Sequence, residues 1–227
     1  MKLVTTKQAL VECLGIANKA VSSRSSIQVL SGVLVDAHEE GTTVSATDME
    51  ISIKAPLVGV VEQPGSLVLP ARLATDIARS LPAGQVVVEQ RLGETHVEIR
   101  AGESLFNLHS LPAADFPQLP QFAGDRFTVS RVAFIETVDR VAPAASRDET
   151  RPVLGGVLVH FAKNQVRMVA TDSYRLSVKE TPIESSVSGT PQVIAPARTL
   201  LELSHIAATV NDDTIAILPT ENQILFE

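Results

Sequence analysis

Two segments of the chain carry apolar residues at the spacing of an amphipathic helix. In Lys7–Val21 the residues that share one face are apolar, namely Leu10, Leu14, Ala17 and Val21. In Ser130–Val141 the inward positions are Phe134, Ile135, Val138 and Val141. Ser130 stands where an N-cap residue is expected. The pattern predicts one helix near the start of the chain and a similar one beginning near residue 130.

Short segments rich in β-branched residues follow the first helix. The turn signal Glu39-Glu40-Gly41 separates the first two and predicts a hairpin. The predicted strands are Gly32–Ala37, Thr43–Ala46, Glu50–Ala55, Ser66–Leu69, Val86–Gln90, Thr95–Arg100 and Ser104–His109. A second helix is predicted over Leu73–Leu81, with a later counterpart at Thr199–Ala207. Two helices beside many short antiparallel strands predict an α+β fold.

The chain repeats itself at an offset of about 125 residues. The segment Val29–Val35 reads VLSGVLV, and Val153–Val159 reads VLGGVLV. An Ala-Thr-Asp ending in Asp48 recurs at Asp172, and a Pro-Ala-Arg ending in Arg72 recurs at Arg198. Three collinear matches at a nearly constant offset indicate two copies of one structural unit.

The repeat predicts two domains, residues 1–124 and residues 125–227. The Pro-rich stretch Leu111–Pro120 precedes the boundary and is interpreted as a linker. The first copy continues beyond Thr95–Arg100 through a strand at Ser104–His109. The matching positions of the second copy would begin near residue 228, so the second domain is expected to lack its last strands.

The composition is that of an ordinary soluble globular protein, with 44% hydrophobic and 20% charged residues. The single cysteine, Cys13, excludes a disulfide framework within the chain, and its position in the first helix predicts a buried thiol. The net charge of −7 disfavours a uniformly basic nucleic-acid-binding surface but allows a local one. The polar N-terminus and the absence of a long apolar run predict a cytoplasmic protein without a membrane segment.

No cofactor or metal motif emerges from the sequence. The histidines are scattered and form no metal-binding pair at helical spacing; they are His38, His96, His109, His160 and His205. The chain has no phosphate-binding glycine loop. Asp48 and Asp172 suggest a paired-carboxylate hydrolase as one alternative, but their recurrence at equivalent positions favours a structural role in a turn after a strand.

The whole chain resembles the bacterial DNA polymerase III β subunit, the replication sliding clamp. The residues that carry the resemblance are the opening Met1-Lys2-Leu3, Arg24, the VLSGVLV segment, Thr47-Asp48, Leu69–Arg72, Leu111–Pro117, Arg151–Gly156 and Ala170–Leu176. The family has three similar domains per chain, and two chains close head to tail around double-stranded DNA. The resemblance implies a complete first domain, most of a second, and no third domain in this sequence.

The resemblance implies a protein that is not an enzyme and needs no cofactor. A clamp keeps the polymerase III catalytic subunit on DNA and also docks the clamp loader and other polymerases and repair proteins. In the family the helices line the central hole. The corresponding basic residues, which we expect to face DNA, are Lys7, Lys19, Arg24, Arg72, Arg79, Arg131, Arg140, Arg147, Arg151 and Arg198.

The resemblance also implies a site for short partner peptides on the second domain. The positions that match it are Leu154, Thr171, Ser173, Tyr174, Arg175 and Leu176. Leu154 and Leu176 would form an apolar floor, and Tyr174 is the only tyrosine in a chain without tryptophan. The other wall of the pocket belongs to the absent part, so the site is expected to be half built.

Ring closure in the family joins the first domain of one chain to the third domain of the other. The residues expected at this interface are Phe106 and Leu108 on an edge strand and Leu73 and Ile77 on the adjacent helix. Without a third domain the homodimer of the family is not expected from this chain. A two-domain clamp that closes as a trimer is a second alternative.

Overall fold

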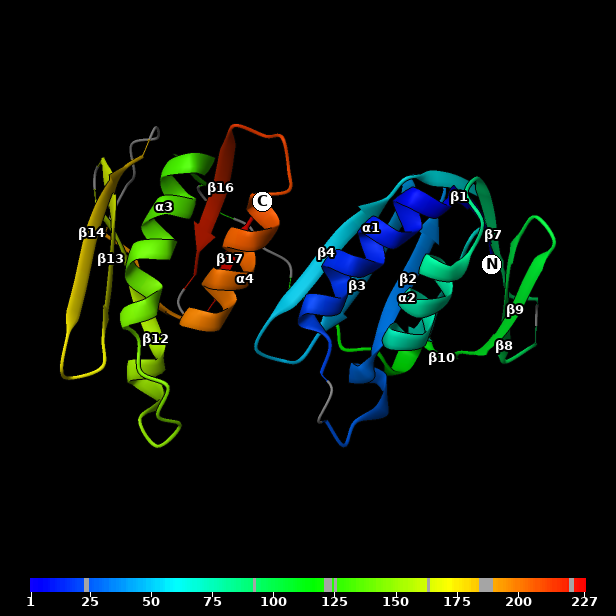
Figure 1. Cartoon of the computed structure of the whole chain (residues 1–227), viewed down its shortest axis with the longest axis horizontal. Helices are drawn as coiled ribbons and strands as arrows, with labels where there is room; N and C mark the ends of the chain where they lie inside the picture. Colours follow the sequence, from blue (N-terminus) through cyan, green and yellow to red (C-terminus); the bar gives the residue numbers. More distant parts are fainter. Residues whose placement is uncertain are drawn as a thin grey trace. The chain divides into compact units, whose positions relative to one another are not determined.

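The computed structural model describes residues 1–22, 25–91, 93–120, 124, 126–162, 164–183, 190–220 and 223–227. They form two compact units, Met1–Leu119 and Pro120–Glu227. Each unit combines helices with antiparallel strands (Figure 1), which confirms the α+β fold class. No helix in this described part of the chain is long and apolar enough to cross a membrane.

The first unit places two helices against two antiparallel sheets. One sheet has the strand order β5-β1-β7-β8-β9, and the other has the order β10-β6-β2-β3-β4. The helices are α1 (Lys7–Ala17) and α2 (Ala71–Ser80). The strands are β1 (Lys2–Thr6), β2 (Gly32–His38), β3 (Gly41–Thr47), β4 (Ser52–Leu57), β5 (Gly59–Gln63), β6 (Gly65–Pro70), β7 (Gln85–Glu89), β8 (His96–Ala101), β9 (Ser104–His109) and β10 (Leu111–Pro112).

The core of the first unit is built from leucine, valine, isoleucine and alanine. Leu10 and Leu14 of α1 are buried in one core with Leu3 of β1 and Ile99 of β8, as the apolar face predicted. The α-helix ends earlier than predicted, at Ala17, and a short 3-10 helix, η1 (Asn18–Ala20), follows it. The Asn18 side chain donates a hydrogen bond of 2.6 Å to the Thr75 hydroxyl of α2, which joins the two helices where α1 stops.

The second unit repeats the arrangement. Its described sheets have the strand orders β14-β13-β12-β15 and β11-β16-β17. Helices α3 (Arg131–Val141) and α4 (Ala197–Ala207) contact each other beside these sheets (Figure 1). The strands are β11 (Phe127–Ser130), β12 (Gly156–Ala162), β13 (Gln165–Thr171), β14 (Leu176–Pro182), β15 (Gln192–Pro196), β16 (Thr214–Pro219) and β17 (Ile224–Phe226). Phe127 and Phe161 stack in the core with ring centroids 4.5 Å apart.

The repeat extends to local geometry. The short 3-10 helices η2 (Gln28–Ser31) and η5 (Pro152–Gly155) precede β2 and β12 at equivalent positions. After β3 and β13 the chain makes the same turn, because Met49 and Ser173 both have positive φ, at 76° and 80°. The two copies therefore share backbone geometry at positions where side chains rarely permit it.

The linker prediction was wrong, and the N-cap prediction holds for the position of Ser130 only. The stretch Leu111–Pro120 is not a free linker, because β10 pairs with Leu67 and Val68 of β6. Phe116 is buried with Val29, Leu30 and Val68. The apolar residues of the stretch therefore anchor it to the first unit. Ser130 precedes α3 as predicted, but its side chain makes no capping hydrogen bond. The proposed boundary at residues 124 and 125 stays a prediction, because Asp125 lies outside the described residues.

Candidate functional site

The turn between β13 and β14 presents most of the residues expected to bind a partner peptide. Asp172 holds this turn, because its Oδ1 accepts hydrogen bonds of 3.0 Å from the backbone amides of Tyr174 and Arg175. Its Oδ2 accepts a bond of 3.0 Å from Arg175 Nε. The backbone bonds from Tyr174 and Arg175, followed by the Arg175 side chain, lower the pKa of the Asp172 carboxyl. The geometry confirms a structural role for this aspartate.

Asp48 of the first unit has the same role. Its Oδ1 accepts hydrogen bonds from the backbone amides of Glu50 (3.0 Å) and Ile51 (2.8 Å). The preceding threonines match as well, since Thr47 Oγ1 accepts from Met49 N and Thr171 Oγ1 accepts from Ser173 N. The two aspartates lie in separate units, each within its own turn, which favours the structural interpretation over a paired-carboxylate hydrolase.

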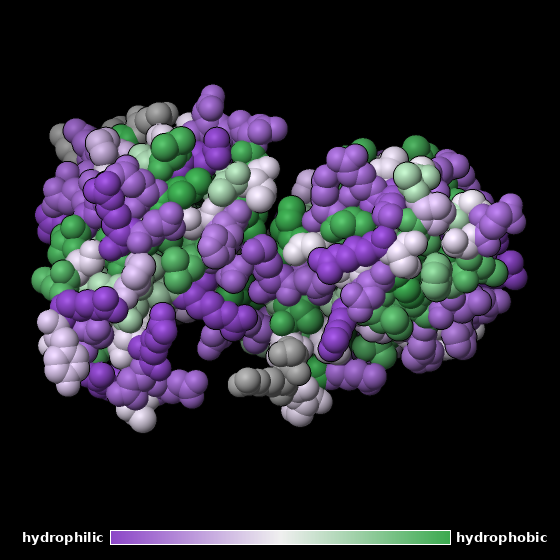
Figure 2. Space-filling view, in the orientation of Figure 1, coloured by the Kyte–Doolittle hydropathy of each residue, from purple (hydrophilic) through white to green (hydrophobic). Residues whose placement is uncertain are grey.

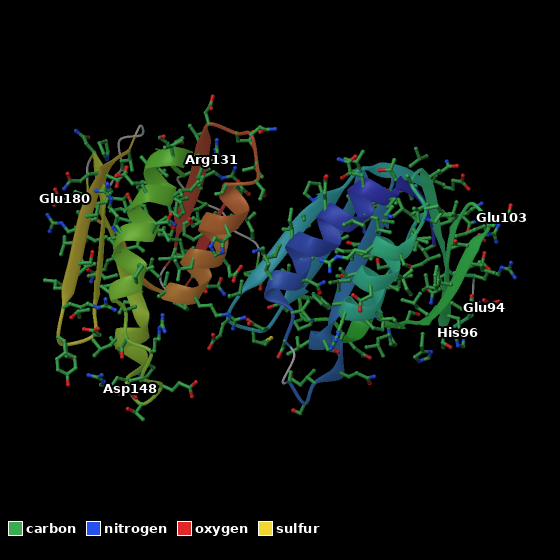
Figure 3. The ribbon with its side chains drawn as sticks, viewed as in Figure 1. Glu94, His96, Glu103, Arg131, Asp148 and Glu180 are labelled. Atoms are coloured by element: carbon green, nitrogen blue, oxygen red, sulfur yellow. The ribbon has the colours of Figure 1, made fainter. Side chains whose placement is uncertain are left out.

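A second loop, residues 145–151, approaches this turn. Asp148, which lies after α3 (Figure 3), accepts hydrogen bonds from the Thr150 hydroxyl at 2.6 Å and from Arg151 Nε at 3.0 Å. The Thr150 hydroxyl makes the largest contribution to lowering the pKa of the Asp148 carboxyl, ahead of the Thr150 amide and the Arg151 side chain. Arg151 Nη1 also donates to Ser173 Oγ at 3.1 Å. This bond joins the loop to the turn that follows β13.

The loop and the turn enclose an open hollow of about 530 Å³. Its lining residues are Ala145, Ser146, Arg147, Asp148, Arg151, Asp172, Tyr174 and Arg175. Tyr174 is 94% exposed at its mouth, so the phenol ring offers nearly its whole surface to an incoming group. A second hydrogen bond fixes the Arg175 side chain, because its Nη2 donates to the Pro143 carbonyl at 2.6 Å.

The structure brings four of the six expected peptide-site residues into this turn. They are Thr171, Ser173, Tyr174 and Arg175, and the Thr171 hydroxyl donates to the Arg175 carbonyl at 2.7 Å. Leu176 begins β14 with 66% of its surface exposed. Leu154 is half-buried in η5 and its carbonyl accepts from Ser146 N at 2.7 Å.

The two aspartates that orient the arginines did not appear among the expected site residues. Each stands three residues before its arginine, as Asp148 before Arg151 and Asp172 before Arg175. This repeated spacing is visible in the sequence and could have identified both pairs. Arg147 and Arg151, which were expected to face DNA, line the hollow, and their contact with DNA stays a prediction.

The remaining basic residues differ in how far they are exposed to solvent. Arg72 and Arg79 of α2, Arg140 of α3 and Arg198 of α4 are exposed. Lys7 donates to the Leu81 carbonyl, and Arg131 donates to the carbonyls of Asp212 (2.6 Å) and Ala207 (3.1 Å). Lys19 is half-buried in η1, and Arg24 lies outside the described residues.

The helices present a surface of mixed charge. Glu12 and Asp76 are exposed on α1 and α2, and Arg140 forms an ion pair of 2.7 Å with Glu136 one turn earlier on α3. Figure 2 shows polar and apolar residues interspersed over the helices of each unit. Exposed ion pairs of this kind leave little net positive potential, so any contact with DNA through these faces is expected to be weak.

Of the four residues expected at the ring interface, two are buried in the core and two are at least partly exposed. Strand β9 is an edge strand of its sheet, as the prediction required. Leu108 (1% exposed) and Ile77 (8% exposed) belong to the core of the first unit, because inward positions of β9 and α2 pack there; their assignment to a contact surface was wrong. Leu73 is 49% exposed, and Phe106 is half-buried against the core.

Comparison with known proteins identifies the family. The N-terminal domain model of the DNA polymerase III beta subunit matches residues 1–120, and the central domain model matches residues 128–227. The beta sliding clamp of Micrococcus luteus is 34% identical over the whole chain, which covers 73% of that protein. The clamp of Bacillus subtilis is 33% identical, and the chain covers 62% of its length.

A solved structure gives the same answer. The crystal structure of the DNA polymerase sliding clamp from Bacillus subtilis superimposes on the whole chain with a TM-score of 0.94 at 32% identity. The chain covers 62% of that structure. The present chain therefore belongs to the bacterial DNA polymerase III beta subunit family, the beta sliding clamps.

Proposed function

We propose that this chain supplies two consecutive domains of a ring that encircles double-stranded DNA and holds the replicative polymerase on it. The observation that carries the proposal is the match of two successive domain models of one family to the two copies of the internal repeat. A ring acts topologically and needs no bond-breaking chemistry. The protein is therefore proposed to work as a processivity factor without enzymatic activity.

A topological role fits the charge of the molecule. The chain has a net charge of −7, and the exposed arginines of its helices stand among acidic residues. A protein that grips DNA by charge alone relies on many phosphate contacts and the counterions they release. We propose that the exposed Arg72, Arg79 and Arg198 make weak, sequence-independent contacts with phosphates inside the ring, which allow it to slide.

The hollow of the second unit is proposed to receive short peptides from the polymerase, the clamp loader and repair proteins. The exposed Tyr174 and Leu176 supply apolar contact area. Arg151 and Arg175 keep their orientation through Asp148 and Asp172. Apolar anchors beside pre-oriented polar groups are what an extended peptide requires.

Peptide binding can be measured on the chain itself. A labelled peptide from the clamp-binding segment of a bacterial replicative polymerase is titrated with the protein, and its fluorescence anisotropy is followed. Tyr174→Ala should weaken binding by about tenfold or more, because exposed aromatics dominate such interfaces. Val60→Ala is the matched control, since Val60 is an exposed apolar residue of the first unit. Equal affinities for the wild type and Tyr174→Ala would contradict this site.

We also propose that the edge strand β9 and the exposed Leu73 join a domain of a second chain when the ring closes. An edge strand carries unpaired backbone groups that a strand of another chain can extend. The half-buried Phe106 and the exposed Leu73 would add apolar area to that contact.

A further inference from the structure

Two histidines face each other across the last two strands of one sheet in the first unit. His96 of β8 pairs directly with His109 of β9 in the antiparallel register. Their ring centroids lie 5.5 Å apart, and the rings are inclined at 67°. His96 lies at the open end of the β8–β9 hairpin, and Glu103 lies at its turn (Figure 3). Twelve residues lie between the two histidines in the sequence, so helical spacing rules could not reveal the pair.

Both imidazoles point away from the core. Their strand neighbours Val97 and Leu108 are buried, and side chains alternate along a strand, so His96 and His109 lie on the outer face of the sheet. Both histidines are exposed. Within the described residues neither ring forms a hydrogen bond or ion pair, which leaves the ring nitrogens available to a ligand.

The separation of the rings fits a shared metal ion. An ion bound to one nitrogen of each ring at about 2.0–2.1 Å in near-tetrahedral geometry places the two ring centroids about 5 Å apart. The observed separation of 5.5 Å is close to this value without any change of the backbone. No group of three or more ligating side chains occurs among the described residues, so the remaining coordination positions would hold water.

We propose that His96 and His109 form a two-histidine site for a divalent transition metal ion such as Zn²⁺ or Ni²⁺. Imidazole is a preferred ligand of these ions. The bound ion would link β8 to the edge strand β9 at the end of the hairpin that has no covalent turn. This role is independent of the proposed clamp function, because it depends only on the fold of the first unit.

The charged groups on the same face favour a cation. Glu98 of β8 lies two residues from His96 and forms an ion pair with Arg100. Glu89 of β7 lies directly opposite Glu98 in the register. Glu94 precedes His96 by two residues and lies near it (Figure 3). Lys2 of β1 lies opposite Glu89 and forms an ion pair of 2.8 Å with Glu62 of β5. On these strands the carboxylates of Glu62, Glu89 and Glu98 therefore stand against the cations Lys2 and Arg100, an excess of one negative charge.

The test is a titration of the 227-residue chain with ZnCl2 and with NiSO4, followed by calorimetry and by NMR shifts of the histidine rings. One saturable site is expected, with the shifts confined to His96, His109 and their neighbours. His96→Asn and His109→Asn should each weaken binding by at least about tenfold. Losing a residue that only supports a metal ligand costs about that much, and losing a ligand itself should cost no less.

A second measurement separates this site from nonspecific binding. Hydrogen exchange of the β9 amides should slow when Zn²⁺ is added to the wild type and should not change in the double variant His96→Asn/His109→Asn. His205→Asn is the control, since it removes an exposed histidine of the second unit. The proposal is overturned if no saturable binding occurs at millimolar Zn²⁺, or if the double variant binds as the wild type does.

Discussion

An aspartate three residues before an arginine fixes each arginine at the hollow of the second unit. Asp148 binds Arg151 Nε and Asp172 binds Arg175 Nε, each at 3.0 Å. The same carboxylates accept hydrogen bonds from backbone amides of their own turns. Each aspartate thus fixes both the backbone of its turn and the side chain of its arginine. Because these groups are already ordered, peptide binding loses less conformational entropy.

The first prediction concerns pH at Asp172. Hydrogen bonds to its charged form lower its pKa in the folded state, so its contribution to stability is fully present above the ordinary carboxyl pKa. That contribution is lost as the pH falls through the lowered folded pKa. The melting temperatures of the wild type and Asp172→Ala should differ at pH 7 and converge at strongly acidic pH. A difference independent of pH would contradict the account, and an NMR titration of the Asp172 carboxyl provides the direct check.

The second prediction concerns Cys13. Burial raises the pKa of its thiol to about 11, because the thiolate loses its hydration inside the first unit. At pH 8 only about one molecule in a thousand would carry the reactive thiolate. The Cys13 side chain is also only 4% exposed, which limits the access of a reagent. A disulfide reagent should therefore label the native chain very slowly and the urea-unfolded chain rapidly. Fast labelling of the native chain would show that the first helix does not hold Cys13 inside.

Some of these residues could be predicted from the sequence and others could not. The recurrence of Asp48 and Asp172 after threonine indicated a turn, because a local hydrogen-bonding role repeats wherever the local sequence repeats. The placement of Arg151 at the hollow depends on its bond with Ser173, 22 residues further along the chain. Local patterns carry no information on such a contact, and the same holds for His96 and His109.

At the scale of the element, the two copies differ in how freely the side chain packed against one glycine can move. Gly32 begins β2, and a Cβ added there would lie 2.4 Å from Cγ1 of Val68. Gly156 begins β12, and a Cβ there would lie 2.3 Å from Cγ2 of Ile194. Val68 is fully buried, whereas Ile194 is 51% exposed and has room to move. The same glycine is therefore under different constraint in the two units.

The third prediction follows from this difference. Gly32→Ala should destabilise the first unit by about 1–3 kcal/mol, because the fully buried Val68 cannot move aside. Gly156→Ala is the matched control in the second unit and should cost less than Gly32→Ala, since the exposed Ile194 can shift toward solvent. Hydrogen exchange of the β2 and β12 amides in urea measures each unit separately. Equal costs at the two positions would contradict the packing argument.

The helices and hairpins were predictable because their hydrophobic periods are clear. Segments such as β9 match their predicted bounds, and α2 and α4 lie close to theirs. Strand β1 was not predicted, because one of its two buried positions is a polar residue. Leu3 and Thr5 are both buried, so the strand lacks the apolar alternation expected of a half-buried strand. The packing of Phe116 on β6 and η2 was also missed. The Pro-rich composition of the segment indicated a linker, and one buried phenylalanine does not change such a pattern.

At the scale of the whole molecule, one α+β unit is used twice. The internal repeat showed this in the sequence, because short motifs kept their spacing. The sequence could not show which faces of the units stay open. Exposure of Leu73, Tyr174 and Leu176 depends on which strands and helices cover them in the folded chain.

The fourth prediction concerns the solution mass of the 227-residue chain. The proposed ring contact needs a third domain opposite β9 and Leu73, so light scattering should give a mass near 24.2 kDa over a micromolar concentration series. A stable mass three times as large would instead support a two-domain clamp that closes as a trimer.

Retention on circular DNA tests the central claim most directly. Residues 1–227 are joined to the remaining C-terminal part of the Micrococcus luteus clamp, and the hybrid is loaded onto nicked circular plasmid with the matching clamp loader. The native Micrococcus luteus clamp serves as the control. The account predicts a dimeric hybrid that stays on the circle during gel filtration and is released when the plasmid is cut once. A folded, dimeric hybrid that fails to stay on the circle, or that stays equally on linear DNA, would contradict it.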